Sequence, residues 1–83
     1  MEVIRVVSVY DKVKENLIEE FELKVPLDIL KEIFKVDDDD DPNMYKVYHI
    51  TETNLPSLVK LIPELGKFNF NNVDLTYECF ELN

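Results

Sequence analysis

The sequence predicts an α+β fold: one small domain over residues 1–83, with elements in the order ββαβαβ, a mainly antiparallel sheet and two helices packed on one of its faces. Two observations favour this class. Segments with the alternation of strands lie at both ends of the chain, and two segments with helical spacing lie between them. Strands and helices do not alternate strictly, as they would around a parallel sheet. Hydrophobic residues make up 46% of the chain, enough for one modest core.

The first two strands are predicted near the N-terminus. Residues 1–10 are rich in β-branched side chains, which are typical of a strand: Val3, Ile4, Val6, Val7 and Val9. Residues 17–23 alternate, with Ile18 on the same side as Glu20 and Glu22, so this second strand has one polar face. The polar residues 11–16 between the two segments predict a hairpin.

Two amphipathic helices are predicted in the middle of the chain. Pro26 suits the first position of a helix, and the helix should end near Lys35 or Val36 because aspartates are poor helix formers. Residues 51–54 offer caps for the second helix, and Pro63 and Gly66 close it. The apolar faces of the two helices are formed by Leu27, Leu30, Ile33 and Phe34, and by Leu55, Leu58, Val59 and Ile62.

The remaining two strands are predicted over residues 45–50 and 75–82. The first is rich in tyrosine and β-branched side chains. Asparagines over residues 69–72 indicate a turn before the last strand. In that strand Tyr77 and Glu81 share one side, and Glu78 and Phe80 share the other.

The chain is strongly acidic, with 18 acidic and 9 basic residues and a net charge of −9. Such a charge repels nucleic acid phosphates and anionic membranes and attracts basic proteins. We therefore expect a protein partner with a basic surface, and neither direct nucleic acid binding nor membrane binding. Negative charge that serves only solubility is the alternative explanation.

The cysteine content and the N-terminus favour a cytoplasmic protein. Cys79 is the only cysteine, so neither an internal disulfide nor a Cys-rich metal site is expected. The N-terminus lacks a basic segment followed by an apolar run, and no apolar run approaches about 18 residues. No cofactor is expected.

The run of five aspartates at residues 37–41 is the most informative feature. It is either a solvated loop that ends the first helix or a docking loop for Lys and Arg side chains of a partner, which Pro42 would stiffen. An exposed tyrosine can anchor an interface, and acidic residues of the last strand can extend the acidic surface. The predicted partner-binding residues are Asp37, Asp38, Asp39, Asp40, Asp41, Tyr45, Glu78 and Glu81.

No catalytic or metal-binding residue is predicted. Asp37, Asp39 and Asp41 alternate as in an EF-hand loop, but Pro42 stands where such a loop needs glycine, and Tyr48 where it needs glutamate. His49 and Cys79 could in principle form a hydrolytic pair, although no turn typical of a nucleophile surrounds the cysteine.

Three segments carry a resemblance to a known class of proteins: residues 41–45 (Asp-Pro-Asn-Met-Tyr), residues 48–50 (Tyr-His-Ile) and residues 77–80 (Tyr-Glu-Cys-Phe). With its small size and acidity, the chain resembles small immunity proteins of bacterial contact-dependent inhibition and related polymorphic toxin systems. The resemblance implies binding to the toxic domain of a partner and blockage of its active site or substrate groove.

Three functional hypotheses follow. The first is a cytoplasmic immunity protein that binds and neutralises a cognate toxin through its acidic surface, with a nuclease that has a basic groove as the expected toxin. The second is a structural or regulatory interaction module that pairs with another subunit, or with a second copy in a homodimer, through a sheet edge. The third is a small hydrolase that uses His49 and Cys79.

Overall fold

The computed structural model describes residues 2–82, which form an antiparallel sheet with helices on one face. The α+β class and the order ββαβαβ are confirmed, with one additional short 3₁₀ helix. The elements are β1 (Glu2–Asp11), β2 (Leu17–Glu22), α1 (Leu27–Phe34), β3 (Tyr48–His49), α2 (Leu55–Leu61), the 3₁₀ helix η1 (Pro63–Lys67) and β4 (Val73–Leu82).

The sheet is built around two long central strands. Its strand order is β2-β1-β4-β3, and every neighbouring pair is antiparallel. β1 and β4 pair over their whole length, from Glu2 opposite Leu82 to Asp11 opposite Val73. β2 accompanies β1 only from Val6 onward, so the end of the sheet that begins at Glu2 is a ribbon of two strands.

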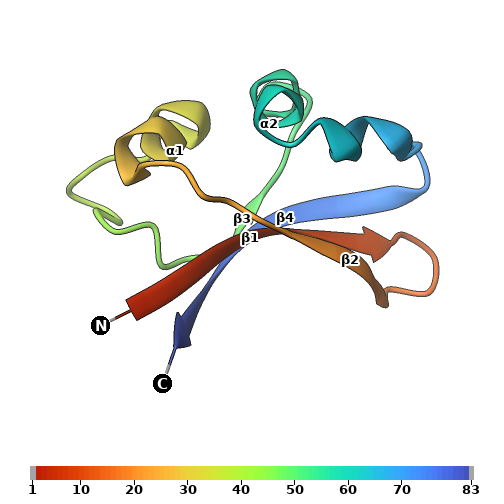
Figure 1. Ribbon diagram of the computed structural model, residues 1–83, viewed down its shortest axis with the longest axis horizontal. Coiled ribbons are helices and arrows are strands. Elements are labelled where there is room, and N and C mark those ends of the chain that lie inside the picture. The colour runs from red at the N-terminus through yellow and green to blue at the C-terminus, as the bar shows by residue number, and fades with distance from the viewer. Residues whose placement is uncertain (1, 83) are drawn as a thin grey trace.

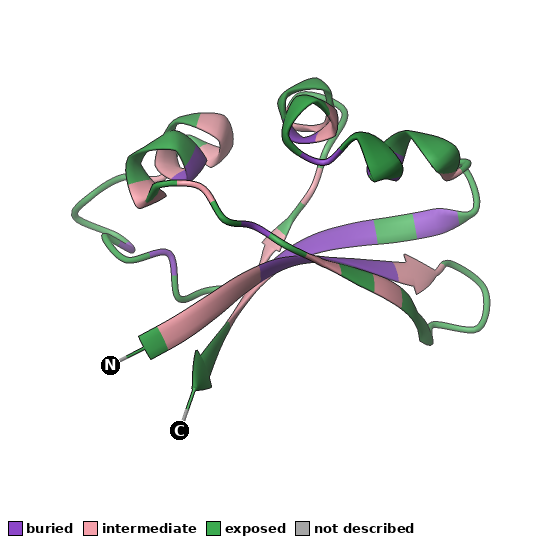
Figure 2. Ribbon diagram, in the orientation of Figure 1, coloured by how far each residue is buried: buried purple, intermediate pink, exposed green. Residues whose placement is uncertain are grey.

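Both helices and η1 lie on the same face of the sheet (Figure 1). The buried positions concentrate between this layer and the middle of β1 and β4, whereas the outer sides of the helices are exposed (Figure 2). The core between the two layers is formed by Val7, Val9, Leu23, Leu30, Met44, Leu58, Ile62, Leu65, Val73, Leu75 and Tyr77. No element formed by residues 2–82 covers the opposite face of the sheet (Figure 1).

Three local details differ from the sequence prediction. Pro26 is the N-cap residue of α1 rather than its first helical residue. Pro63 begins η1 instead of closing the second helix, which already ends at Leu61. The predicted strand over residues 45–50 is reduced to Tyr48 and His49, because residues 41–46 are held in a turn.

No helix within residues 2–82 combines the length and the apolar character needed to cross a membrane.

Leu58 and Leu61 in α2 allow a matched test of the helix layer. Leu58 is fully buried and Leu61 is 37% exposed. We expect Leu58→Ala to lower the free energy of unfolding by about 2–5 kcal/mol, because it leaves a cavity beneath the helix. Leu61→Ala should cost less than about 1 kcal/mol. Urea denaturation of both variants measures the difference, and equal losses would contradict this packing.

Candidate functional site

The first four aspartates of the acidic run form an ordered, exposed turn directly after α1. The Asp37 carboxylate accepts a hydrogen bond from the backbone N–H of Asp39 (2.9 Å), and the Asp37 carbonyl accepts one from the N–H of Asp40 (3.0 Å). Asp38 forms an ion pair with Lys31, and Asp40 forms one with Lys46 at 3.2 Å. We call residues 37–40 the aspartate turn.

Asp41 differs from the rest of the run: the solvated loop and the docking loop both require it to be exposed, and that expectation is wrong. The residue is only 6% exposed. Its carboxylate accepts hydrogen bonds from the Tyr48 hydroxyl (2.7 Å) and from the backbone N–H groups of Tyr45 and Lys46 (both 3.1 Å). These bonds occupy the carboxylate within the chain, so Asp41 organises the following loop.

The hydrogen bonds to Asp41 decide its ionisation. Burial works to raise the pKa of the Asp41 carboxyl, but the bonds from Tyr48 and from the backbone outweigh it and hold the pKa below the ordinary value of 3.8. Burial, together with the bond to Asp41, raises the pKa of the Tyr48 hydroxyl far above its usual range. The pair is therefore a carboxylate and a neutral phenol at pH 7.

The loop from Asn43 to Tyr45 is fastened to the sheet by side chains of β1 and β4. Arg5 Nη2 donates to the Asn43 carbonyl at 2.9 Å, and the Tyr77 hydroxyl donates to the Met44 carbonyl at 2.8 Å. Met44 is buried in the left-handed conformation (φ 51°). This leaves Tyr45 about half exposed next to the anchored loop.

A second surface, which the sequence prediction did not identify as a site, is the face of the sheet opposite the helices. We call it the uncovered face. Strand alternation and register place five carboxylates on it: Glu2, Glu20, Glu22, Asp74 and Glu78. No strand residue of this face is Lys or Arg.

The basic residues are segregated from this face. Arg5 lies on the helix side of β1, and the eight lysines lie in turns, connections and helices. Lys12, in the turn after β1, places its Nζ 3.9 Å from an oxygen of Asp74, at the margin of the face. The uncovered face is thus the one extended surface of the sheet where acidic groups lie without interleaved bases.

A hydrogen-bonded cluster lies at the centre of the uncovered face. The hydroxyls of Tyr10 (2.7 Å) and Thr76 (2.6 Å) both donate to the same oxygen, Oε2, of Glu78. Tyr10 pairs with Asp74 in the register, so its side chain must reach across Ser8 and Thr76 to meet Glu78. This explains why Ser8 is fully buried although no element covers it. The bond to Glu78 also raises the pKa of the Tyr10 hydroxyl, with a smaller contribution from burial.

The two-stranded end of the uncovered face is apolar. Ile4 pairs directly with Phe80, which is 43% exposed, and Leu82 lies beside Glu2. An exposed aromatic residue next to aliphatic side chains is typical of interface anchors. The face therefore combines acidic groups with an apolar contact area.

The predicted residues Glu78 and Glu81 do not act together, because they lie on opposite faces of the sheet. Glu78 lies on the uncovered face and Glu81 on the helix side. The sequence did contain a signal for the uncovered face: Glu20 and Glu22 lie on the same side of one strand, and Glu78 and Phe80 lie on the same side of another. Only the strand order and register show that these two sides belong to the same face of the sheet.

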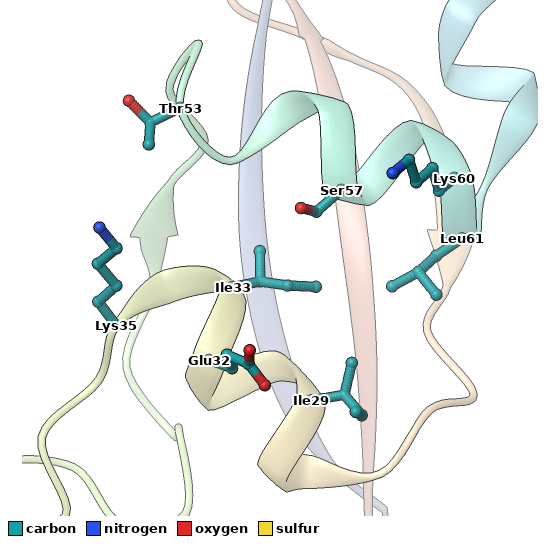
Figure 3. A pocket seen from close by; sticks show the side chains of 8 residues that line it. All are labelled: Ile29, Glu32, Ile33, Lys35, Thr53, Ser57, Lys60 and Leu61. Atoms are coloured by element: carbon teal, nitrogen blue, oxygen red, sulfur yellow. The ribbon is translucent and has the colours of Figure 1, made fainter.

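A groove of about 410 Å³ lies between α1 and α2 (Figure 3). Ile29, Ile33 and Leu61 form its apolar part. Its rim combines Glu32 with Lys35 and Lys60, so its charge is mixed and does not select a basic partner.

The structure does not bring together the residues that a Cys–His hydrolase or a metal site would need within residues 2–82. His49 pairs with Thr76 and lies on the uncovered face, whereas Cys79 lies on the helix side, so the Cys–His pair of a hydrolase does not form. Within residues 2–82, no group of three or more His, Cys, Asp or Glu side chains converges in a way that could hold a metal ion.

The outer edge of the sheet at β2 carries Glu19, Glu20 and Glu22 within six residues. Antiparallel pairing of two copies along this edge would place glutamates opposite or diagonal to glutamates, which is unfavourable at neutral pH. The charge of β2 therefore disfavours self-association through this edge.

Comparison with known proteins gives one match. The model of a family described as a domain of unknown function (DUF7683) matches residues 4–78, which include residues 4–11 of β1 and residues 73–78 of β4. No curated protein and no solved structure shows a significant match.

Asp41→Asn tests the anchoring carboxylate. The amide cannot accept all three hydrogen bonds, so we expect the free energy of unfolding at pH 7 to fall by about 1–3 kcal/mol. Because the folded-state pKa lies below 3.8, the ionised form stabilises the fold above that pH, and its contribution is lost as the pH falls through the lower folded-state value. Urea denaturation should therefore show the gap between wild type and variant shrinking in acid.

Asp39→Asn is the matched control, since Asp39 is exposed and has no ion-pair partner within residues 2–82. It makes the same change of charge and should alter stability by less than about 0.5 kcal/mol. An equal loss in both variants would contradict the anchoring role of Asp41.

Proposed function

We propose that this chain, which belongs to the DUF7683 family, binds a protein with a basic surface and neutralises it, as an immunity protein neutralises a toxin. It acts by occupying the basic surface of its partner and not by catalysing a reaction. The partner in this proposal is a cognate bacterial toxin domain, with a nuclease as the best candidate.

One observation carries the proposal: the charged side chains that the strands place on the uncovered face are all acidic. Five carboxylates lie on the uncovered face with no Lys or Arg among its strand residues, while the bases lie on the helix side and in turns. Charge that served only solubility would not require this segregation, because interleaved charges also keep a surface soluble. A one-signed, extended surface is instead suited to steering an oppositely charged partner.

The composition of the face favours a protein over other polyions. Nucleic acids and anionic membranes are repelled by a net charge of −9. The apolar area around Ile4, Phe80 and Leu82 needs apolar side chains opposite it, which a folded protein supplies. In a toxic nuclease, the groove that binds phosphates must be basic, so an acidic inhibitor can occupy the site that nucleic acid would use.

The aspartate turn is a second acidic surface that can contribute to this binding. Its carboxylates are exposed, but Asp38 and Asp40 already pair with lysines of the chain. To bind a basic side chain of a partner, each of these carboxylates would have to leave its lysine or contact both cations at once. The turn therefore offers less free charge than its sequence suggests, and the uncovered face supplies most of the attraction.

Co-expression with the toxin domain encoded beside this chain's gene tests the proposal. Wild type should restore growth of cells that express the toxin and should co-purify with it. The variant Glu20→Lys/Glu22→Lys/Asp74→Lys should protect poorly, with an association rate at least about 10-fold lower, because it reverses the charge of the uncovered face.

The matched control is Asp28→Lys/Glu52→Lys/Glu64→Lys, which makes the same charge change at exposed positions on the helix side. It should retain protection and lose less than about 3-fold in association rate. Absence of binding and protection by wild type would refute the proposal.

Ionic strength provides an independent test of how the partner is attracted. Screening shortens the Debye length from about 10 Å at 0.1 M salt to about 3 Å at 1 M. We expect the association rate, measured by stopped-flow fluorescence or surface plasmon resonance, to fall steeply over this range while the dissociation rate changes little. An association rate that does not depend on salt would favour pairing through backbone hydrogen bonds at a sheet edge instead.

A further inference from the structure

We propose that the uncovered face contains a binding position for an arginine side chain of the partner, located above Val6 between Glu22 and Glu78. This inference rests on the proposed function and names the part of the face that recognises the partner. It concerns the chemistry of one side chain, so it can be tested apart from toxin neutralisation.

The register places two carboxylates on either side of an apolar floor. Val6 of β1 pairs with Glu22 of β2 on one side and with Glu78 of β4 on the other, and all three side chains point away from the helices. Neighbouring strands lie about 4.8 Å apart, so the backbones of the two glutamates are separated by about 10 Å. A cation that lies over Val6 can therefore reach both carboxylates.

Glu78 is held ready to accept such a cation. Its Oε2 already accepts short hydrogen bonds from Tyr10 and Thr76, which fix the orientation of the carboxylate. No hydrogen bond from residues 2–82 reaches its other oxygen, Oε1. A carboxylate that is pre-oriented in this way loses less side-chain entropy on binding than a free surface glutamate.

The neighbouring apolar row favours arginine over lysine. Ile4 and Phe80 form the next cross-strand pair of the same face, and the Phe80 ring is partly exposed. A guanidinium can stack on an aromatic ring and donate hydrogen bonds to two carboxylates at once. An ammonium group is a compact charge and cannot form this planar set of contacts.

A buried polar group on the other side of the position is an independent indication of a ligand. Ser8 is fully buried beneath Tyr10, and its hydroxyl oxygen has no hydrogen-bond partner in the described chain. An unsatisfied buried hydroxyl is unfavourable. A guanidinium that binds both oxygens of Glu78 displaces the Tyr10 hydroxyl from Oε2, while the bond from Thr76 keeps the carboxylate oriented. The released Tyr10 hydroxyl can then donate to Ser8 and satisfy it.

Nuclear magnetic resonance with defined peptides tests this position. The probe is a short capped peptide that alternates arginine and leucine, and the comparison peptide has lysine in place of arginine. At low salt, we expect the arginine peptide to shift the amide signals of Val6, Ser8, Glu78 and Phe80, and to bind at least about 5-fold more tightly than the lysine peptide.

Variants of the face make the test specific. Glu78→Gln should weaken binding of the arginine peptide about 10-fold, the loss of one charge-assisted contact. Glu81→Gln, which makes the same change on the opposite face, should weaken it less than about 2-fold. Phe80→Ala should weaken it about 3-fold by removing the stacking surface. Circular dichroism and the urea midpoint of each variant verify that the fold is kept.

The outcomes separate this inference from the proposed function. Signal shifts confined to Asp37–Asp40, equal binding of both peptides, or no effect of Glu78→Gln would overturn the arginine position. If the toxin is still neutralised in that case, the proposed function stands without it. If the arginine peptide binds as expected but no toxin is bound or neutralised, the arginine position stands and the proposed function fails.

Discussion

The pairing of β1 with β4 over ten residues is the interaction on which the rest of the structure depends. The two strands carry the central core residues on one side, where α1, α2 and η1 pack against them. These helices are short, with eight, seven and five residues, and the chain provides no second layer within residues 2–82. One face of the sheet is therefore left to solvent or to a partner.

The charges follow from this arrangement. On the helix side, two charged groups of the sheet have partners from the other layer or the loops: Glu19 binds Lys67, and Arg5 binds the Asn43 carbonyl. The uncovered face has no covering layer that would impose such pairing, and its charged strand residues are all carboxylates. The resulting one-signed surface is the physical basis of the proposed attraction to a basic protein.

Asp41 shows how an acidic run can serve structure and surface at the same time. Its carboxylate collects three hydrogen bonds and fixes the loop that leads to β3, while its four predecessors remain exposed. The aromatic rings of Phe34, Tyr48 and Tyr77 pack together beneath this loop, with ring centroids 5.5–5.8 Å apart. The segment Asp-Pro-Asn-Met-Tyr, which suggested the resemblance to immunity proteins, is therefore a structural anchor of the fold.

The sequence by itself determined the α+β class, the four strands, the two helices and the net charge, because alternation, helical spacing and composition are local properties. It could not determine that Asp41 is buried, because Asp41 is one of five consecutive aspartates. These residues differ only in the surroundings that folding gives them. It also could not determine that Glu22, Val6 and Glu78 form one row, because strand order joins segments more than fifty residues apart. Tertiary pairing alone decided which carboxylates share a surface.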